Sequence, residues 1–439
     1  MTQYQELEAQ LSDFDAAKRR AALVQLTRSV AAADAPPCRE VANMHSHSFF
    51  SFNAFGFSPS RIAWLAKTSG YGLMGIVDFD VLDGAEEFLS ACELLGVRGS
   101  VGVETRVYIP EFGAYEINSV GEPGVYYVMG IGFPGGETPA RAADLLSDMR
   151  QRATRRNQTM LSTLNAYLAP VNISYEGDVL PLTPGGYATE RHIVLAYVRA
   201  AERTVSDLTA YWAEKLSMQT AQATTLLADP AVLQNTIRVR LMKRGGVGYV
   251  KPNLTSFPTL EEFQAFVKAC GALPCATWLD GTSDGEARIE DLLTLLISKG
   301  VRALNIIPDR NWNNSDPEMH RRKVQHLYDV VALAAKLDLP LVVGTEMNSF
   351  GQRLIDDFDA PHLAPVRDAF LDGAYFIYGH TLAQRTLGIG HQSEWAQAQF
   401  HSRSQLNAFY TKLGRAMPNT ATTQQQLIAL KSTISSMTP

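Results

Sequence analysis

The stretch YGLMGIVDFDVLDGAEEFLSACELLGVRGSVGVET, residues 71–105, decides the fold of this chain. It begins and ends with short runs rich in valine and glycine, which are typical of buried strands. Between them, the segment from Asp83 to Gly96 has apolar residues at helical spacing and ends in a glycine. The order is strand, helix, strand, and a helix between two strands is the usual connection of a parallel pair.

The same alternation extends in both directions. Upstream, a short strand ends near His47, and SPSRIAWLAKTSG is predicted to be a helix with Ser58 as its cap and Pro59 in its first turn. Downstream, the predicted strands are VYYVMGIGF, LPCATWLDG, VRALNIIPDR, LPLVVGTEMNS and AYFIYGHT. We therefore predict an α/β fold with a parallel sheet closed into a TIM-like barrel.

Helical segments are expected outside this barrel. Residues 1–40 form a helical N-terminal extension, because apolar residues recur at helical spacing up to the break at Ala35–Pro37. The barrel is expected over 41–391, with a helical insertion at about 197–247. Residues 392–439 are polar with no further strand pattern, and we predict a helical C-terminal tail.

Composition limits the possible partners. The 439 residues contain 39 basic and 45 acidic side chains, so the net charge of -6 argues against extended nucleic acid as a partner. No apolar run is long enough to cross a bilayer, and the four cysteines form no C-x-x-C pair. We expect a cytoplasmic protein that does not interact with membranes; the sequence leaves its oligomeric state open.

Candidate ligands follow most of the predicted strands. The active sites of α/β barrels form at the C-terminal ends of the strands, so these positions indicate chemistry. One H-x-H pair arises by chance in roughly one such sequence in five, a lone acid there more often caps the next helix, and a lone histidine is more often a core residue. The candidates are His45, His47, Asp78, Asp80, Glu104, Asp280, Asp309, Glu346 and His380.

The order of five segments resembles the PHP family, named for polymerase and histidinol phosphatase. The segments are MHSHS, GIVDFD, VGVET, TERHIVLAYV and VVGTEMNS, and the resemblance spans roughly residues 41–350. It implies a distorted (β/α)7 barrel, metal-dependent hydrolysis of phosphoesters and a site for up to three metal ions.

The resemblance also implies a set of metal ligands. His45, His47, Glu104 and Glu346 match the first metal site of the family, and Glu104 matches the carboxylate that bridges to a second ion. His192 matches a ligand of that second ion, Asp280 stands near its missing histidine, and Asp78 belongs to the third site. The sequence departs from the family at Phe79, Trp278 and Asn348, where side chains without a strong donor replace histidines. We therefore expect one or two divalent transition-metal ions (Zn, Mn or Fe).

These residues predict a hydrolase that cleaves a small phosphorylated metabolite or nucleotide with a metal-activated water. Arg191 and Arg310 are candidates for binding phosphate oxygens, although each could equally form a surface ion pair. His380 is predicted to act as a general acid or as a further ligand. The alternative is a barrel that binds a metal or ligand in a regulatory role without turnover.

Overall fold

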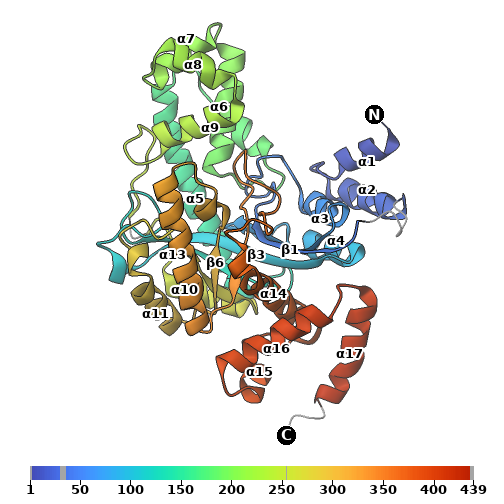
Figure 1. Cartoon of the computed structure of the whole chain (residues 1–439). Helices are drawn as coiled ribbons and strands as arrows, with labels where there is room; N and C mark the ends of the chain where they lie inside the picture. Colours follow the sequence, from blue (N-terminus) through green and yellow to red (C-terminus); the bar gives the residue numbers. More distant parts are fainter. Residues whose placement is uncertain (1, 30–35, 254, 436–439) are drawn as a thin grey trace.

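A seven-stranded sheet curls into a nearly closed barrel at the centre of the protein (Figure 1). The computed structural model describes residues 2–29, 36–253 and 255–435. The strands follow one another in chain order around the sheet, as a distorted TIM-like barrel requires. They are β1 (Arg39–Ser46), β2 (Tyr71–Phe79), β3 (Arg98–Tyr108), β4 (Val125–Ile131), β5 (Leu273–Trp278), β6 (Ala303–Ile306) and β7 (Leu341–Val343).

The two edges of the sheet meet just beyond the ends of β1 and β7. A single parallel bridge joins Ser46 to Glu346. The N–H of Glu346 donates to the carbonyl of His45 at 2.8 Å, and the N–H of His47 donates to the carbonyl of Glu346 at 2.6 Å. The backbone of the two sequence segments with the strongest ligand pattern is therefore joined at this seam.

The expectation of a fully parallel sheet is wrong at one strand. β4 is antiparallel to both of its neighbours, β3 and β5. The segment between β3 and β4 contains only a short 3-10 helix, Pro110–Phe112, and lacks the crossover helix that a parallel pair needs. The C-terminal end of β4 consequently lies beside the start of β5, at the opposite end of the barrel from the other strand ends.

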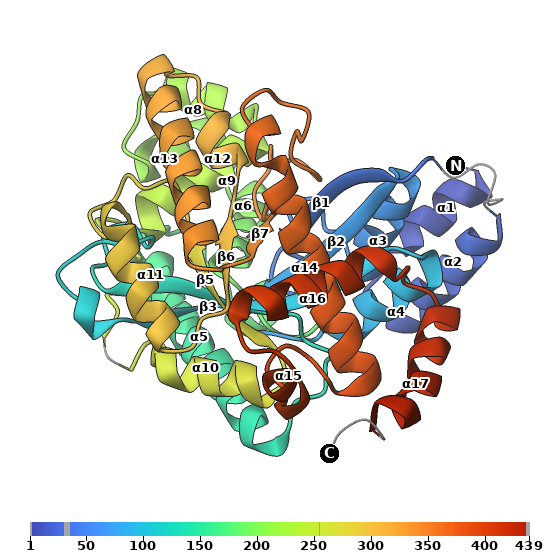
Figure 2. The same cartoon turned by 60° about the horizontal axis from the view of Figure 1, so that its bottom comes forward.

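Helices cover the outside of the barrel, mostly between successive strands (Figure 2). The sequence predicted the helix caps well: the Ser58 hydroxyl accepts the N–H of Arg61 at 3.0 Å, and Gly96 ends the next helix with φ 70°. These helices are α3 (Pro59–Thr68), α4 (Ala85–Leu95), α10 (Leu260–Ala269), α11 (Ile289–Ser298), α12 (Asp309–Trp312), α13 (Pro317–Lys336) and α14 (Arg367–Leu387).

The prediction of a strand at AYFIYGHT is wrong, because Ala374–Thr381 lies inside α14. This part of the helix is buried on all sides, between the barrel and the C-terminal helices. A helix without a polar face has no 3.6-residue periodicity in its apolar residues, so a short apolar run within it reads as a strand.

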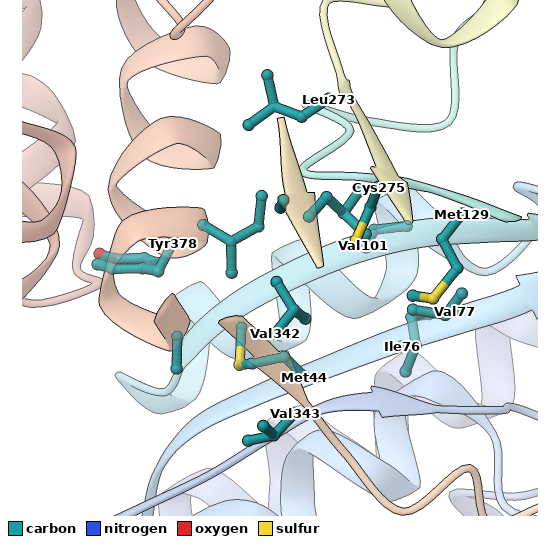
Figure 3. Packing of buried hydrophobic residues seen from close by; sticks show 14 of the residues in the cluster. Met44, Ile76, Val77, Val101, Met129, Leu273, Cys275, Val342, Val343 and Tyr378 are labelled. Atoms are coloured by element: carbon teal, nitrogen blue, oxygen red, sulfur yellow. The ribbon is translucent and has the colours of Figure 1, made fainter. Parts of the chain in front are cut away.

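The barrel interior is filled by side chains from successive strands. Met44, Val77, Met129 and Val342 are among the labelled residues that pack there (Figure 3). They belong to a large buried hydrophobic cluster that extends outward to the surrounding helices. The barrel is therefore a packed core, and any ligand must bind at one of its ends.

A second buried cluster lies outside the barrel, and we call the helices around it the roof. Its residues run from Met160 to Met242, so the helical unit is larger than the predicted insertion at 197–247. The roof helices gather at the top of Figure 1. They are the second half of α5 (Ala140–Tyr167), with α6 (Glu190–Thr204), α7 (Leu208–Lys215), α8 (Thr220–Leu227) and α9 (Pro230–Ile237).

Both terminal regions are helical, as the sequence predicts. Figure 1 shows the N-terminal helices beside α3 and the C-terminal ones below the barrel. No helix of the described residues is long and apolar enough to cross a membrane. The terminal helices are α1 (Gln3–Gln10), α2 (Ala16–Ser29), α15 (Glu394–Gln399), α16 (Arg403–Ala416) and α17 (Ala421–Ser435).

Candidate metal centre

His45, His47 and Glu104 converge at the C-terminal end of the barrel. His45 is on β1, His47 follows two residues later, and Glu104 on β3 is in register with the last residue of β2, Phe79. The Oε2 atom of Glu104 lies 3.6 Å from Nε2 of His45 and 3.4 Å from Nε2 of His47. Among the described residues these three form a group whose ligand atoms all lie within 4.8 Å of one another. Their exposed fractions are only 1%, 0% and 5%.

The tautomer of His47 follows from its neighbours. The Ser51 hydroxyl donates its single hydrogen to Asp78, over 2.6 Å to Oδ1. The oxygen of Ser51 must then accept at its contact with Nδ1 of His47, which is 3.0 Å long. His47 therefore carries its hydrogen on Nδ1 and directs the lone pair of Nε2 toward Glu104.

The tautomer of His45 is set in the same way from another strand. Nδ1 of His45 lies 3.2 Å from Oδ1 of Asn305 on β6. The orientation of the Asn305 amide is fixed, because its Nδ2 donates to the carbonyl of Val342 at 3.0 Å. Oδ1 can only accept, so His45 also carries its hydrogen on Nδ1 and has a free lone pair on Nε2.

Three lone-pair atoms therefore face one another in a buried space. Nε2 of His45, Nε2 of His47 and Oε2 of Glu104 have no hydrogen-bond partner in the described structure. Acceptors at such distances repel unless a proton or a cation lies among them. Burial raises the pKa of the Glu104 carboxyl, whereas positive charge on the two imidazoles would outweigh burial and hold this pKa below its ordinary value, as a bound cation would. The donor set of two imidazoles and one carboxylate fits a divalent transition metal.

Glu346, the predicted fourth ligand, has other partners. Its Oε2 accepts from Arg310 at 3.1 Å and from Gln352 at 2.9 Å. Burial raises the pKa of the Glu346 carboxyl, but Arg310 and the two histidines overcome this and lower it to about 2. Its backbone is strained, with φ 63°. The carboxylate is ionised beside the cluster, and its role as a ligand stays a prediction.

Asp78 supports the cluster from behind. Besides Ser51, its carboxylate accepts the N–H of Ser48 at 2.8 Å and the hydroxyl of Ser48 at 2.6 Å. Asp78 is thus fully engaged with the loop that follows β1. In this arrangement it orients His47 through Ser51.

His192 and Asp280 lie outside the group of three. Nδ1 of His192 accepts the N–H of Thr189 at 3.0 Å in a capping box at the start of α6. This places the hydrogen of the neutral ring on Nε2 and leaves neither nitrogen free for a metal, while burial lowers the pKa of His192 to about 3. Asp280 forms an ion pair with Lys323 at 2.8 Å.

His380 is far from its predicted place. It lies in the middle of α14, where Nδ1 accepts the N–H of His391 at 3.0 Å. Its ring packs against Gly132, which follows the C-terminal end of β4. Because β4 is antiparallel, this is the end of the barrel opposite the cluster of His45, His47 and Glu104.

A cavity lies between the cluster and the roof. Its floor includes His45, Glu104 and Glu346, and helices α5 and α6 form part of its wall. Arg191 and Arg310 both line it, and their role in binding phosphate stays a prediction. Arg310 is paired with Glu346, whereas the Arg191 side chain has no ion pair or hydrogen bond within the described ranges.

Two supporting residues were missed in the sequence. Asn305 is a polar residue inside the apolar run ALNI of β6, a signal that was visible. Ser51 gave no signal, because serines are common in loops. Three residues stand where the PHP family has histidines. Phe79 stacks on the His47 ring with centroids 4.6 Å apart, Trp278 is buried, and Asn348 lines the cavity.

Comparison with solved structures shows which fold this chain shares. No protein-family model matches the sequence, and no curated protein does. An amidohydrolase from Chromobacterium violaceum, solved with bound sulfate and no metal, is similar with a TM-score of 0.51 and 16% identity, over 75% of this chain and 96% of that one. This chain shares its barrel fold. A Bifidobacterium adolescentis protein named as a metal-dependent phosphoesterase is 19% identical, with a TM-score of 0.46, over 76% of this chain and 98% of that one.

Proposed function

We propose that this protein is a metal-dependent hydrolase that cleaves a phosphoester of a small molecule, as the resemblance to the PHP family implies. The observation that carries the proposal is the convergence of Nε2 of His45, Nε2 of His47 and Oε2 of Glu104 without hydrogen-bond partners. Such atoms are costly to bury unless they bind a cation.

In the proposed site, His45, His47 and Glu104 hold the ion. A divalent ion bound there supplies Lewis acidity toward a phosphoryl oxygen and lowers the pKa of a coordinated water. Ser51 and Asn305 keep the two imidazoles in the tautomers that a ligand needs, and Asp78 fixes Ser51. Glu346 is a candidate fourth ligand if Arg310 turns toward the substrate.

The cavity fits a small anionic substrate. Arg191 and Arg310 line it together with Glu346, and guanidinium groups bind phosphate oxygens through two parallel hydrogen bonds. Residues of α5 and α6 line the cavity above the barrel end. A small phosphorylated metabolite or nucleotide therefore suits the site better than a long polynucleotide does.

A binding role without turnover is the second candidate. The pairing of Glu346 with Arg310 favours it, because this carboxylate is engaged and the arginine is not free for phosphate. The capping role of His192 favours it too, since a second ion would lack that ligand. The same experiment separates the two candidates.

The test starts with protein purified without added metal. We expect about one equivalent of Zn, Mn or Fe and fewer than three ions after soaking, because Phe79 and Trp278 offer no donor. His47→Ala should lose the ion, and the matched control His401→Ala, at an exposed histidine, should keep it. A panel of small phosphomonoesters is then assayed with each ion.

Hydrolysis that depends on His47 but not on His401 supports the phosphoesterase. Metal bound without hydrolysis of any panel member supports the binding role. Failure to take up any of the three ions would refute the metal centre and the hydrolase, and would leave only a barrel that binds another ligand.

A further inference from the structure

Arg156 on α5 differs from most of the other basic residues that line the cavity, because its side chain has no acceptor among the residues that the structure describes. Apart from Arg191, each of the others has an acceptor for its side chain within the described residues. Arg106 pairs with Glu122, Arg152 with Asp148, Arg238 and Lys243 with Glu190, Arg310 with Glu346, and Arg244 donates to the carbonyl of Gly121. Arg156 has neither an ion pair nor a hydrogen bond there, and its Nε atom is buried without a partner.

The Arg156 guanidinium is nevertheless in contact with an aromatic ring. It lies over the ring of Phe257 at 5.4 Å, and Arg106 lies over the same ring at 4.4 Å. Stacking uses the face of a guanidinium and leaves the N–H groups in its plane free to donate. Arg156 is therefore held in place with its hydrogen-bonding capacity unused.

Two positive groups share this part of the cavity. Burial lowers the pKa of Arg156, and the neighbouring charge of Arg106 lowers it further. Asp80 and Glu190 are the acids that act on Arg156, and both are occupied. Asp80 accepts from Thr105 at 2.5 Å and from Tyr187 at 2.7 Å, and Glu190 pairs with Arg238 and Lys243. A half-buried cation whose Nε is enclosed without an acceptor is destabilising unless an anion binds to it.

Arg156 and Arg191 serve different parts of the cavity. Arg191 is on α6, whereas Arg156 is on α5 and lies over Phe257 beside Arg106. An anion held at Arg156 would be a different group from the phosphoryl group held near His45 and His47. The cavity has a second cationic position.

We propose that Arg156 binds a second anionic group of the substrate, so that the preferred substrates carry a phosphoester and a further phosphate or carboxylate. This inference rests on the proposed function, in which the first anionic group occupies the metal centre. It defines the substrate class as small molecules with two anionic groups, and it makes Arg156 a specificity-determining residue.

The test measures binding of stable probes by calorimetry, with metal-loaded protein and without any need for turnover. The probes are methylphosphonate, alkane bisphosphonates of increasing chain length and phosphonocarboxylates of the same lengths. We expect at least one two-anion probe to bind about 10- to 100-fold more tightly than methylphosphonate, the range of one charge-assisted hydrogen-bonded contact. The affinities of the bisphosphonates and the phosphonocarboxylates of equal length show whether a phosphate or a carboxylate is preferred as the second anion.

Arg156→Gln should abolish this preference and leave the affinity for methylphosphonate unchanged. Arg155→Gln is the matched control, because Arg155 is the exposed neighbour on the same helix and does not line the cavity. Equal affinities of wild type for one-anion and two-anion probes, or an equal loss of both in Arg156→Gln, would overturn the inference. A preference that depends on Arg156, in a protein that hydrolyses no phosphoester, would retain the anion site and refute only the hydrolase.

Discussion

The Oγ atom of Ser51 lies 3.0 Å from Nδ1 of His47 and gives its own hydrogen to Asp78. Asp78 therefore determines, through one hydroxyl, which nitrogen of His47 carries the lone pair that faces Glu104. The chain Asp78–Ser51–His47 explains how a buried carboxylate outside the group of His45, His47 and Glu104 still belongs to the site.

Ser51→Ala should weaken the affinity for the metal by about 10- to 100-fold, because the ring of His47 loses the acceptor that holds its hydrogen on Nδ1. Titration with Zn against a chelator of known affinity measures this. Ser48→Ala is the control, since Ser48 contacts Asp78 but neither imidazole. Equal losses of metal affinity in Ser51→Ala and Ser48→Ala would show that the hydrogen bonds to Asp78, and not the contact with His47, determine the affinity.

Arg191→Gln should raise the KM for a phosphomonoester about 10-fold or more, since a charge-assisted contact to the phosphate is lost. Steady-state kinetics on the best substrate of the panel gives the value. Arg199→Gln removes the same charge from an exposed position on α6 and should leave KM unchanged. A KM that stays constant in Arg191→Gln would exclude this residue from phosphate binding.

Acid should destabilise the protein through His391. Burial lowers its pKa to about 4 from an ordinary 6.5, its Nε2 lies 2.9 Å from Oδ1 of Asn407, and its Nδ1 is buried without a partner. Between pH 6.5 and 4 the unfolded chain binds the proton and the folded chain does not. The contribution to stability is therefore complete above pH 6.5 and is lost as the pH falls toward 4.

The free energy of unfolding should fall by about 2 kcal/mol between pH 7.5 and 5 on account of this one residue. Urea denaturation at the two pH values, compared with His391→Gln, measures the contribution as the difference between the two falls. The exposed His401→Gln serves as control and should retain the full acid sensitivity. An identical pH response of wild type and His391→Gln would contradict the assignment.

Gly373→Ala should destabilise the protein by about 3 kcal/mol or more, because α14 packs directly on β7 at this residue. A Cβ atom there would lie 1.6 Å from the carbonyl oxygen of Leu341. Gly177→Ala is the control, since its nearest neighbour would be 3.5 Å away. Thermal unfolding of both variants is the measurement, and a Gly373→Ala protein as stable as the control would show that the helix moves away at little cost.

The order of the strands was predictable from the sequence, because each buried run is flanked by helix caps and glycines. The direction of β4 was not, since a run of valine and tyrosine is compatible with either orientation. The antiparallel direction of β4 puts Gly132, which the His380 ring contacts, at the end of the barrel opposite His45, His47 and Glu104. His380 therefore cannot join these three residues. The apolar stretch in α14 misled the prediction for a related reason: full burial removes the periodicity that distinguishes a helix from a strand.

The site was predictable where ligand type and strand position agree, as in His45, His47 and Glu104. It was less so where a side chain has a choice of partners. Arg310 pairs with Glu346 and Lys323 with Asp280, across gaps in sequence that no local pattern reveals. Arg156 is the converse case: only the structure shows that its neighbours leave it without an acceptor.

The two separate hydrophobic clusters have an evolutionary consequence. Because the roof is packed around its own interior, substitutions there are expected to combine additively with those in the barrel. A lineage can thus exchange the cavity wall for another while the end of the barrel that holds His45, His47 and Glu104 stays unchanged. Diversification of substrate choice within such proteins should therefore be recorded in the cavity wall, from Arg156 on α5 to Met242, and inheritance of the three ligand positions in and beside the strands.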